Sequence, residues 1–168
     1  MTTNEWQRFH QVTAHIPPTH RLYRASAPNY LFNDITQQLT ESASAFLVSH
    51  HITRIISLTQ PKYTDSELEA LDKAGIQYLH LPVKDFTAPT LDQLASAAEF
   101  FWGAEGTGTL VHCGYGHGRT GTCVTALQLF VTRGESPPEE EWRGVNRVEK
   151  DVQVDVLREY REKVRKVD

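Results

Sequence analysis

The stretch Val111-His112-Cys113-Gly114-Tyr115-Gly116-His117-Gly118-Arg119-Thr120-Gly121 is the most informative part of this chain for both fold and function. It begins as the end of a short apolar strand, continues as a glycine-rich turn and leads into the first turn of a helix. Its glycines let the backbone curl tightly, so that successive N–H groups can donate hydrogen bonds to phosphate oxygens. The positive N-terminal end of the following helix faces the same point. The stretch therefore predicts a binding site for a phosphate group.

Cys113 and Arg119 add chemistry to this phosphate site. Five residues separate them, and the Arg119 guanidinium can hold two phosphate oxygens at once and stays protonated in proteins. The loop N–H groups, the helix end and the arginine all stabilise a thiolate, which is the nucleophilic form of cysteine. Cys113 could instead be an ordinary buried cysteine, but the spacing and the intervening glycines favour a nucleophile. The predicted phosphate-binding residues are Gly114, Tyr115, Gly116, His117, Gly118 and Arg119.

On both sides of this stretch, predicted strands alternate with predicted helices. Short runs rich in apolar and β-branched residues predict strands at residues 22–25, 52–58, 76–83 and 109–112. Apolar periodicity and capping residues predict helices at residues 39–51, 64–75, 90–102, 119–133 and 150–164, with a further helix beginning near Pro137. This alternation predicts an α/β fold with a central, mostly parallel twisted sheet flanked by helices on both faces.

Length and composition fit one compact domain. A chain of 168 residues, 39% of them hydrophobic and 23% charged, can bury a core of its own. We expect a single domain over residues 21–168, preceded by an N-terminal extension, residues 1–20, for which the sequence predicts no role. No run approaches the roughly 18 to 20 apolar residues of a membrane span, and the N-terminus lacks a secretion signal. We therefore expect a cytoplasmic monomer without stable membrane insertion.

Charge and cysteine content narrow the class of ligand. A formal net charge of -4 argues against a nucleic-acid binder, whereas residues 106–134 contain no Asp or Glu and would favour an anion. Residues 135–168 mix both signs, which is typical of a solvated helical surface. Cys113 and Cys123 cannot form a disulfide framework, and no Cys or His cluster has zinc-ligand spacing, so we expect neither a metal nor an organic cofactor. Cys123 is expected to be a core residue, with oxidative pairing to Cys113 as the alternative.

Three segments resemble one known family. His112-Cys113-(five residues)-Arg119-Thr120-Gly121 resembles the signature of the cysteine-based protein tyrosine and dual-specificity phosphatases, and the small, atypical dual-specificity members most. Leu81-Pro82-Val83-Lys84-Asp85-Phe86-Thr87-Ala88-Pro89-Thr90 is similar to the family's general-acid loop and lies at the usual distance upstream. Val148-Glu149-x-x-Val152-Gln153 is similar to the segment that carries a water-positioning glutamine. The resemblance covers most of the chain from about Leu22 onward.

The resemblance implies a role for each matching residue. Cys113 attacks phosphorus to form a phosphocysteine, while Arg119 and the loop N–H groups hold the spreading negative charge. Asp85 protonates the leaving oxygen and then acts as a base toward the hydrolytic water. The resemblance further implies that Thr120 donates a hydrogen bond to the departing sulfur, that His112 braces the loop and that Gln153 positions water.

Some of these assignments have simpler alternatives. Asp85 stands between a strand and a proline-marked turn, where an aspartate often only shapes the turn. Gln153 could be an ordinary glutamine on the surface of a helix. His117 occupies a position where family members often carry an apolar residue, or a lysine in the phosphoinositide-directed members. It is either a plain rim residue or a contact to a second anionic group of the substrate. Gly114 stands where the phosphoinositide-directed members carry another lysine, which argues against lipid specificity.

These observations predict a cysteine-dependent phosphatase that hydrolyses phosphomonoesters through a phosphocysteine. The expected partner is a phosphorylated protein, carrying phosphotyrosine, phosphoserine or phosphothreonine, or a small phosphorylated molecule. The chain lacks the additional elements with which larger tyrosine-specific enzymes deepen their sites, so we expect a shallow pocket. A phosphatase of inositol phosphates, phosphoinositides or organic diphosphates remains an alternative. A silent phosphate-binding module is a further alternative, although Cys113, Arg119 and Asp85 argue against it.

Overall fold

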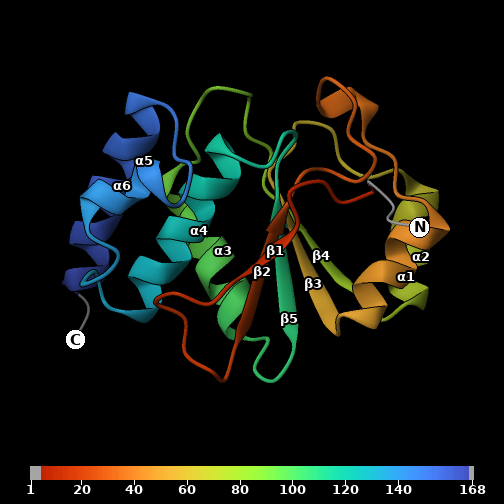
Figure 1. Ribbon diagram of the computed structural model, residues 1–168, viewed down its shortest axis with the longest axis horizontal. Helices are drawn as coiled ribbons and strands as arrows, with labels where there is room; N and C mark the ends of the chain where they lie inside the picture. The colour runs from red at the N-terminus through yellow and green to blue at the C-terminus, as the bar shows by residue number, and fades with distance from the viewer. Residues whose placement is uncertain (1–4, 167–168) are drawn as a thin grey trace.

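The computed structural model describes residues 5–166 and contains a five-stranded sheet in the order β1-β2-β5-β3-β4 (Figure 1). The strands are β1 His10–Val12, β2 Arg21–Ala25, β3 Ile52–Ser57, β4 Gln77–His80 and β5 Gly108–His112. β1 pairs antiparallel with β2, and every other pairing is parallel. The predicted α/β fold with a mostly parallel sheet is confirmed.

Helices cover both faces of this sheet (Figure 1). One face carries α1 Glu41–Ser49 and α2 Asp65–Lys73, and the other carries α3 Leu91–Trp102 and α4 Gly118–Val131. Two further helices, α5 Glu139–Gly144 and α6 Asp151–Arg165, pack on the outer side of α4. No helix within residues 5–166 is both long and apolar enough to cross a membrane. The helices predicted from the sequence all form, with boundaries shifted by one or two residues at most ends.

Strand β5 lies in the middle of the sheet and is buried along its whole length. Successive side chains of a strand point to opposite faces, so Leu110 packs with the α1–α2 side and Val111 with the α3–α4 side. Helix starts are fixed by side-chain caps, since Thr64 and Thr90 each form a capping box with the residue three positions later. Short local signals of this kind explain why the element order could be read from the sequence.

The segment before β2 is part of the fold, although the sequence predicted no element there. Trp6 is buried and donates a hydrogen bond from Nε1 to the carbonyl of Ala43 at 3.0 Å. The carbonyl of Gln7 accepts from the N–H of Ser26 at 2.8 Å, just beyond the end of β2. β1 has only three residues, too few for a periodic signal. Through the bond to Ser26, this segment reaches the sheet edge at which the parallel strands end.

The parallel strands bring three loops to their common carboxyl edge, the usual ligand site of open α/β sheets. These loops are the glycine-rich turn after β5, the segment after β4 that contains Asp85, and the segment after β2. The last of these contains a short 3-10 helix, η1, Asp34–Thr36. Helix α6 approaches the same edge. The chain before α6 packs against α4 at Gly121, where a Cβ would collide with the carbonyl of Asn146, so glycine allows this close contact.

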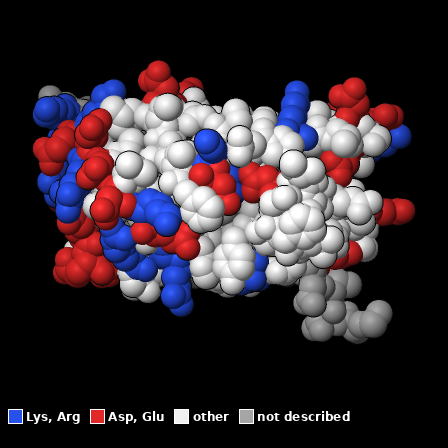
Figure 2. Space-filling model, turned by 90° about the horizontal axis from the view of Figure 1, so that it is seen from above, with Lys and Arg blue, Asp and Glu red and all other residues white. Residues whose placement is uncertain are grey.

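Figure 2 views this edge from above and shows how charge is distributed over it. Acidic and basic side chains alternate densely over the end of the molecule that α5 and α6 form, as expected for residues 135–168. Ion pairs there include Arg158 with Glu139 at 2.7 Å and Arg165 with Glu162 at 3.1 Å. Exposed pairs of this kind contribute little to stability.

Candidate active site

The loop that follows β5 is fixed by hydrogen bonds to its carbonyl groups. Four consecutive carbonyl oxygens accept a bond from the surrounding structure, at distances of 2.7–3.0 Å: Cys113 from His112 Nδ1, Gly114 from the Ala27 N–H, Tyr115 from Arg8 Nε and Gly116 from Arg24 Nη2. The N–H groups of Gly114, Tyr115, His117 and Gly118 donate to no other residue in the described part of the chain. Fixing the carbonyls in this way leaves the N–H groups for a ligand.

Cys113 is almost completely buried at the start of this loop, with 2% of its surface exposed. Its Sγ accepts a hydrogen bond from the N–H of Gly116 at 3.3 Å. Gly116 has φ +106°, which L side chains rarely adopt, and a Cβ there would crowd Ala25 and Ser26. Glycine at this position thus lets an N–H group turn toward the sulfur.

Arg24 supports the loop from the adjacent strand β2. It is buried in β2 and donates to the carbonyls of Gly116 at 3.0 Å and Asn146 at 2.8 Å. Burial lowers the pKa of Arg24 to about 10, so the side chain is still charged at neutral pH. A buried positive charge beside the loop favours a phosphate in the loop.

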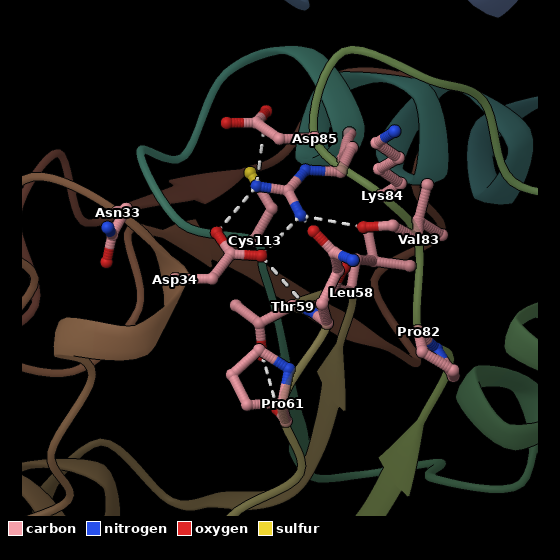
Figure 3. A network of polar contacts seen from close by, with 12 residues as sticks. Asn33, Asp34, Leu58, Thr59, Pro61, Pro82, Val83, Lys84, Asp85 and Cys113 are labelled. Carbon is pink, nitrogen blue, oxygen red and sulfur yellow. Dashed lines mark hydrogen bonds and ion pairs between the residues drawn. The ribbon is translucent and has the colours of Figure 1, made fainter.

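Arg119 is held by a second set of acceptors. Its Nη1 donates to the Asp34 carboxylate at 2.7 Å and to the Val83 carbonyl at 2.8 Å, and its Nη2 donates to Asp34 at 2.8 Å. Nη1 also reaches the Leu58 carbonyl at 3.3 Å. Only 2% of Arg119 is exposed, and Figure 3 shows the network beside Cys113. The guanidinium therefore has a fixed position next to the thiol.

Asp85 lies at the mouth of the same site. Its side chain is 51% exposed, and its Oδ1 is 3.3 Å from Arg119 Nη2. Figure 3 shows the carboxyl above the sulfur of Cys113. The loop that carries Asp85 is closed by Thr87, which donates to the Lys84 carbonyl through its N–H at 3.0 Å and its hydroxyl at 2.6 Å. The structure thus brings the predicted acid to the predicted nucleophile and arginine.

Gln153 connects this acid loop to α6. It is buried, with 1% exposed, so it is not the ordinary surface glutamine of the alternative interpretation. Its Oε1 accepts from the N–H groups of Glu149 and Lys150, both at 3.0 Å, and its Nε2 donates to the Thr87 carbonyl at 3.1 Å. In this structure Gln153 holds the loop that carries Asp85.

Thr120 does not contact the nucleophile through its hydroxyl. The Oγ1 atom is buried and has no hydrogen-bond partner within residues 5–166, Cys113 Sγ included. The hydrogen bond from Thr120 to a departing sulfur stays a prediction for the phosphorylated state of the enzyme.

His112 braces the loop from a fully buried position. Its Nδ1 donates to the Cys113 carbonyl at 3.0 Å, and its Nε2 accepts from the Tyr63 hydroxyl at 2.7 Å. Burial lowers the pKa of His112 to about 4, so the ring is neutral at physiological pH. A neutral ring can donate with one nitrogen and accept with the other, as this chain of bonds requires.

His117 lies at the N-terminal end of α4, on the rim of the loop. Burial, followed by the charges of Arg24, Arg147 and Arg8, lowers the pKa of His117, so its ring is neutral at pH 7. Its ring contacts that of Tyr115 in an edge-on arrangement, with ring centroids 4.8 Å apart. The contact of His117 with a second anionic group stays a prediction.

Cys123 lies inside α4 and is fully buried in the same core cluster as Cys113. Burial raises the pKa of the Cys123 thiol to about 12, and it is therefore a neutral packing residue at physiological pH. Both cysteines are free in this structure.

Four supporting residues were missed from the sequence: Arg8, Arg24, Asp34 and Tyr63. Arg24 gave a usable signal, because a charged residue inside a predicted buried strand requires buried partners. Arg8, Asp34 and Tyr63 gave none, since each lies in a segment whose local pattern predicts only a turn or irregular chain.

A buried thiol at the start of a loop with unpaired peptide N–H groups, beside a fixed guanidinium, is the arrangement that cysteine-based phosphatases use, and fold and site together place the chain in that class. Residues 24–166 match the model of the family described as Swiss Army Knife protein, DSP-PTPase phosphatase domain (PTP-SAK), and the chain belongs to this family. It is therefore a small, atypical member of the cysteine-based tyrosine phosphatase superfamily. A comparison with curated protein sequences gave no match.

Solved structures with the same fold include three well-covered examples. Tk-PTP, in its G95A mutant form, is 27% identical with a TM-score of 0.67, covering 94% of this chain and 97% of its own. Kinase-associated phosphatase (KAP), with its catalytic cysteine substituted by serine, is 20% identical with a TM-score of 0.74, covering 96% and 98%. PTPMT1 is 22% identical with a TM-score of 0.70, covering 94% and 96%. The last two likenesses concern the fold alone.

The low pKa of His112 predicts a dependence of stability on pH. The pKa is about 4 in the folded state and 6.5 when unperturbed, so the unfolded state binds more protons in between and the free energy of unfolding falls as pH falls through this window. His112→Asn, whose side chain does not titrate, should show a shallower fall. Urea unfolding of both proteins across the window measures this difference, and parallel curves would contradict it.

Proposed function

We propose that this phosphatase hydrolyses phosphoprotein monoesters, on tyrosine and on serine or threonine, through a phosphocysteine at Cys113. The observation that carries the proposal is the loop after Cys113, whose carbonyls are bonded to surrounding residues while the N–H groups of Gly114, Tyr115, His117 and Gly118 have no partner in the described part of the chain. A dianionic phosphate needs several donors converging on one point, and this loop supplies them together with Arg119.

In the first step the Cys113 thiolate attacks phosphorus and forms the S–P bond. The bond between phosphorus and the ester oxygen breaks, and the carboxyl of Asp85 gives its proton to that oxygen. Arg119 and the loop N–H groups hold the three other phosphoryl oxygens, on which negative charge spreads in the transition state. Asp85 is suited to this role because it is half-exposed at the mouth of the site and lies beside Arg119 Nη2.

In the second step water attacks the phosphocysteine. The Asp85 carboxylate takes a proton from the water, the S–P bond breaks and the thiolate returns, which leaves inorganic phosphate in the loop. Gln153 supports this step by holding the acid loop through the Thr87 carbonyl, and its Nε2 has one further N–H with which to contact the water.

The rim of the site favours a substrate presented on an open surface. Asp85, Phe86 and Tyr115 are each about half-exposed or more, so the phosphate is not reached through a deep channel. An open rim gives both long and short phosphorylated side chains access to Cys113. Aromatic rim residues also provide apolar contact for an aryl group or a peptide backbone.

A small phosphorylated molecule is the competing substrate class. PTPMT1 has been solved in complex with PI(5)P, and SIW14 from S. cerevisiae is a PP-IP phosphatase, so this fold serves more than protein substrates. The charges of Arg24, Arg147 and Arg8 act on His117 and would favour an additional anionic group near it. Gly114 and His117 replace the loop lysines expected of a phosphoinositide-directed enzyme, and this favours phosphoprotein as the substrate.

Cys113→Ser is the direct test of the covalent mechanism. The variant should lose hydrolysis of p-nitrophenyl phosphate, because an alcohol is a far weaker nucleophile than a thiolate, while it still binds inorganic phosphate. Vanadate should inhibit the parent protein, and a metal chelator should have no effect. Turnover retained by the serine variant, or lost with the chelator, would rule out the phosphocysteine route.

Asp85→Asn separates a general acid from a residue that only shapes a turn. An alkoxide leaves much less readily than p-nitrophenolate, so turnover of an alkyl phosphate such as phosphoserine should fall by about 10²- to 10⁴-fold, and that of the aryl ester by less. The decline of the parent's rate at high pH should flatten in the variant. Equal losses on both esters, with an unchanged decline, would make Asp85 a turn former and direct the search to Asp92 or Asp65.

A substrate panel tests the preference for protein. Catalytic efficiency on phosphotyrosine and phosphothreonine peptides should exceed that on inositol polyphosphates, phosphoinositides and organic diphosphates. His117→Leu should then reduce all efficiencies alike. A preference for the multiply phosphorylated molecules, lost selectively in His117→Leu, would assign the enzyme to small molecules instead.

A further inference from the structure

Asp34 is a buried carboxylate that none of the reaction steps above uses. It has 7% of its surface exposed, lies in η1 and binds Arg119 through both of its oxygens. Burial acts to raise the pKa of Asp34, but the hydrogen bond from Arg119, the N–H of Gln60 and the charge of Arg119 outweigh it, so the net shift is downward. The side chain is therefore ionised at neutral pH and pairs as an anion with the guanidinium.

The geometry of this pair leaves part of Arg119 free. A guanidinium presents its five N–H donors along two useful edges, an end-on edge of Nη1 and Nη2 and a side-on edge of Nε and Nη2. Asp34 takes the end-on edge, with oxygens at 2.7 and 2.8 Å. Nε donates to no residue in the described part of the chain, and Asp85 lies 3.3 Å from Nη2. The side-on edge thus remains open on the side of the proposed acid.

Gly114 gives independent evidence that the loop packs directly against Asp34. Its φ is not in the left-handed region, so the backbone conformation alone does not require glycine there. A Cβ at this position would instead collide with Asp34 Oδ1 and lie 3.2 Å from Arg119 Nη2. The absence of a side chain at Gly114 makes room for the ion pair against the loop.

We propose that Asp34 is a positioning residue for phosphoryl transfer, which binds the end-on edge of Arg119 so that the side-on edge faces the phosphate. The proposal rests on the proposed function, in which Arg119 binds the transferring phosphoryl group. Asp34 has a second effect, because it is the carboxylate that competes with Asp85 for the guanidinium. Without Asp34, Asp85 is the only carboxylate paired with Arg119, and the guanidinium is free to turn toward it.

Asp34→Asn tests the charge while preserving the shape of the side chain. We expect kcat for p-nitrophenyl phosphate to fall on the order of 10²-fold, as is typical when a catalytic group is misplaced, and the inhibition constants of inorganic phosphate and vanadate to rise. A purely structural role of Asp34 would lower stability without raising these inhibition constants.

Asn33→Ala is the matched control. Asn33 caps the same short helix by accepting from the Ile35 N–H at 3.1 Å, and Figure 3 shows its side chain turned away from the ion pair. This variant should remove the cap but leave the ion pair in place, so kcat and the inhibition constants of phosphate and vanadate should stay near parent values. Equal losses in Asn33→Ala and Asp34→Asn would overturn the proposal.

A double-mutant cycle with Gly114→Ala tests the contact itself. In the parent the added methyl group should displace the Asp34 carboxylate and reproduce the kinetic loss of Asp34→Asn. In the Asp34→Ala background the collision with the carboxylate is gone and only the contacts with Tyr30 at 3.1 Å and Arg119 Nη2 at 3.2 Å remain, so Gly114→Ala should cost less there. An equal cost of Gly114→Ala in both backgrounds would overturn the proposed contact.

Phosphate binding by the Cys113→Ser protein separates this proposal from the proposed function. Calorimetry with inorganic phosphate should show weaker binding when Asp34→Asn is added to the serine variant. If binding is unchanged, the positioning role is wrong even where the parent hydrolyses phosphate esters through Cys113. If the parent proves inactive while Asp34→Asn still weakens phosphate binding, the catalytic function fails and the contact stands.

Discussion

The buried charge of Arg119 is the constraint on which the carboxyl edge of this sheet depends. A guanidinium with 2% of its surface exposed must find acceptors within the protein, because an unpaired charge in such a place is very costly. Its acceptors are the carbonyls after β3 and β4, at Leu58 and Val83, and the carboxylate of Asp34 after β2. One side chain at the start of α4 therefore ties together the chain segments that follow three parallel strands. The acid loop and η1 occupy their places in part because they satisfy this charge.

The glycines of the loop show how far one sequence pattern can be interpreted. From the sequence, Gly114, Gly116 and Gly118 share one explanation, a tightly curled backbone. In the structure only Gly116 has a positive φ, of +106°, whereas a Cβ on Gly114 would meet Asp34 and one on Gly118 would meet Glu149. Two of the glycines thus provide space for acidic side chains from distant segments. A sequence pattern can indicate that glycine is required without indicating what it makes room for.

The parts of the site that were predictable from the sequence have local or family-specific signals. The order of strands and helices follows from periodicity and caps, and the positions of Cys113, Arg119 and Asp85 follow from short motifs on adjacent loops. The supporting contacts lack such signals, because they join residues far apart in the chain. Arg119 and Asp34 are separated by 85 positions, and Arg8 and the Tyr115 carbonyl by 107. Which turn residue meets which loop is decided by packing, and periodicity contains no information about it.

The titratable groups of the site divide according to whether the reaction needs them to change charge. His112 and Cys123 are fully buried without a charged hydrogen-bonding partner, and burial keeps the ring and the thiol neutral near pH 7. Arg119 and Asp34 are buried as a pair, and each holds the other in its charged form. Asp85 differs from all four because half of its side chain meets solvent. A group that must release a proton in one step and take one up in the next needs access to water, and of these five groups Asp85 has the most exposed side chain.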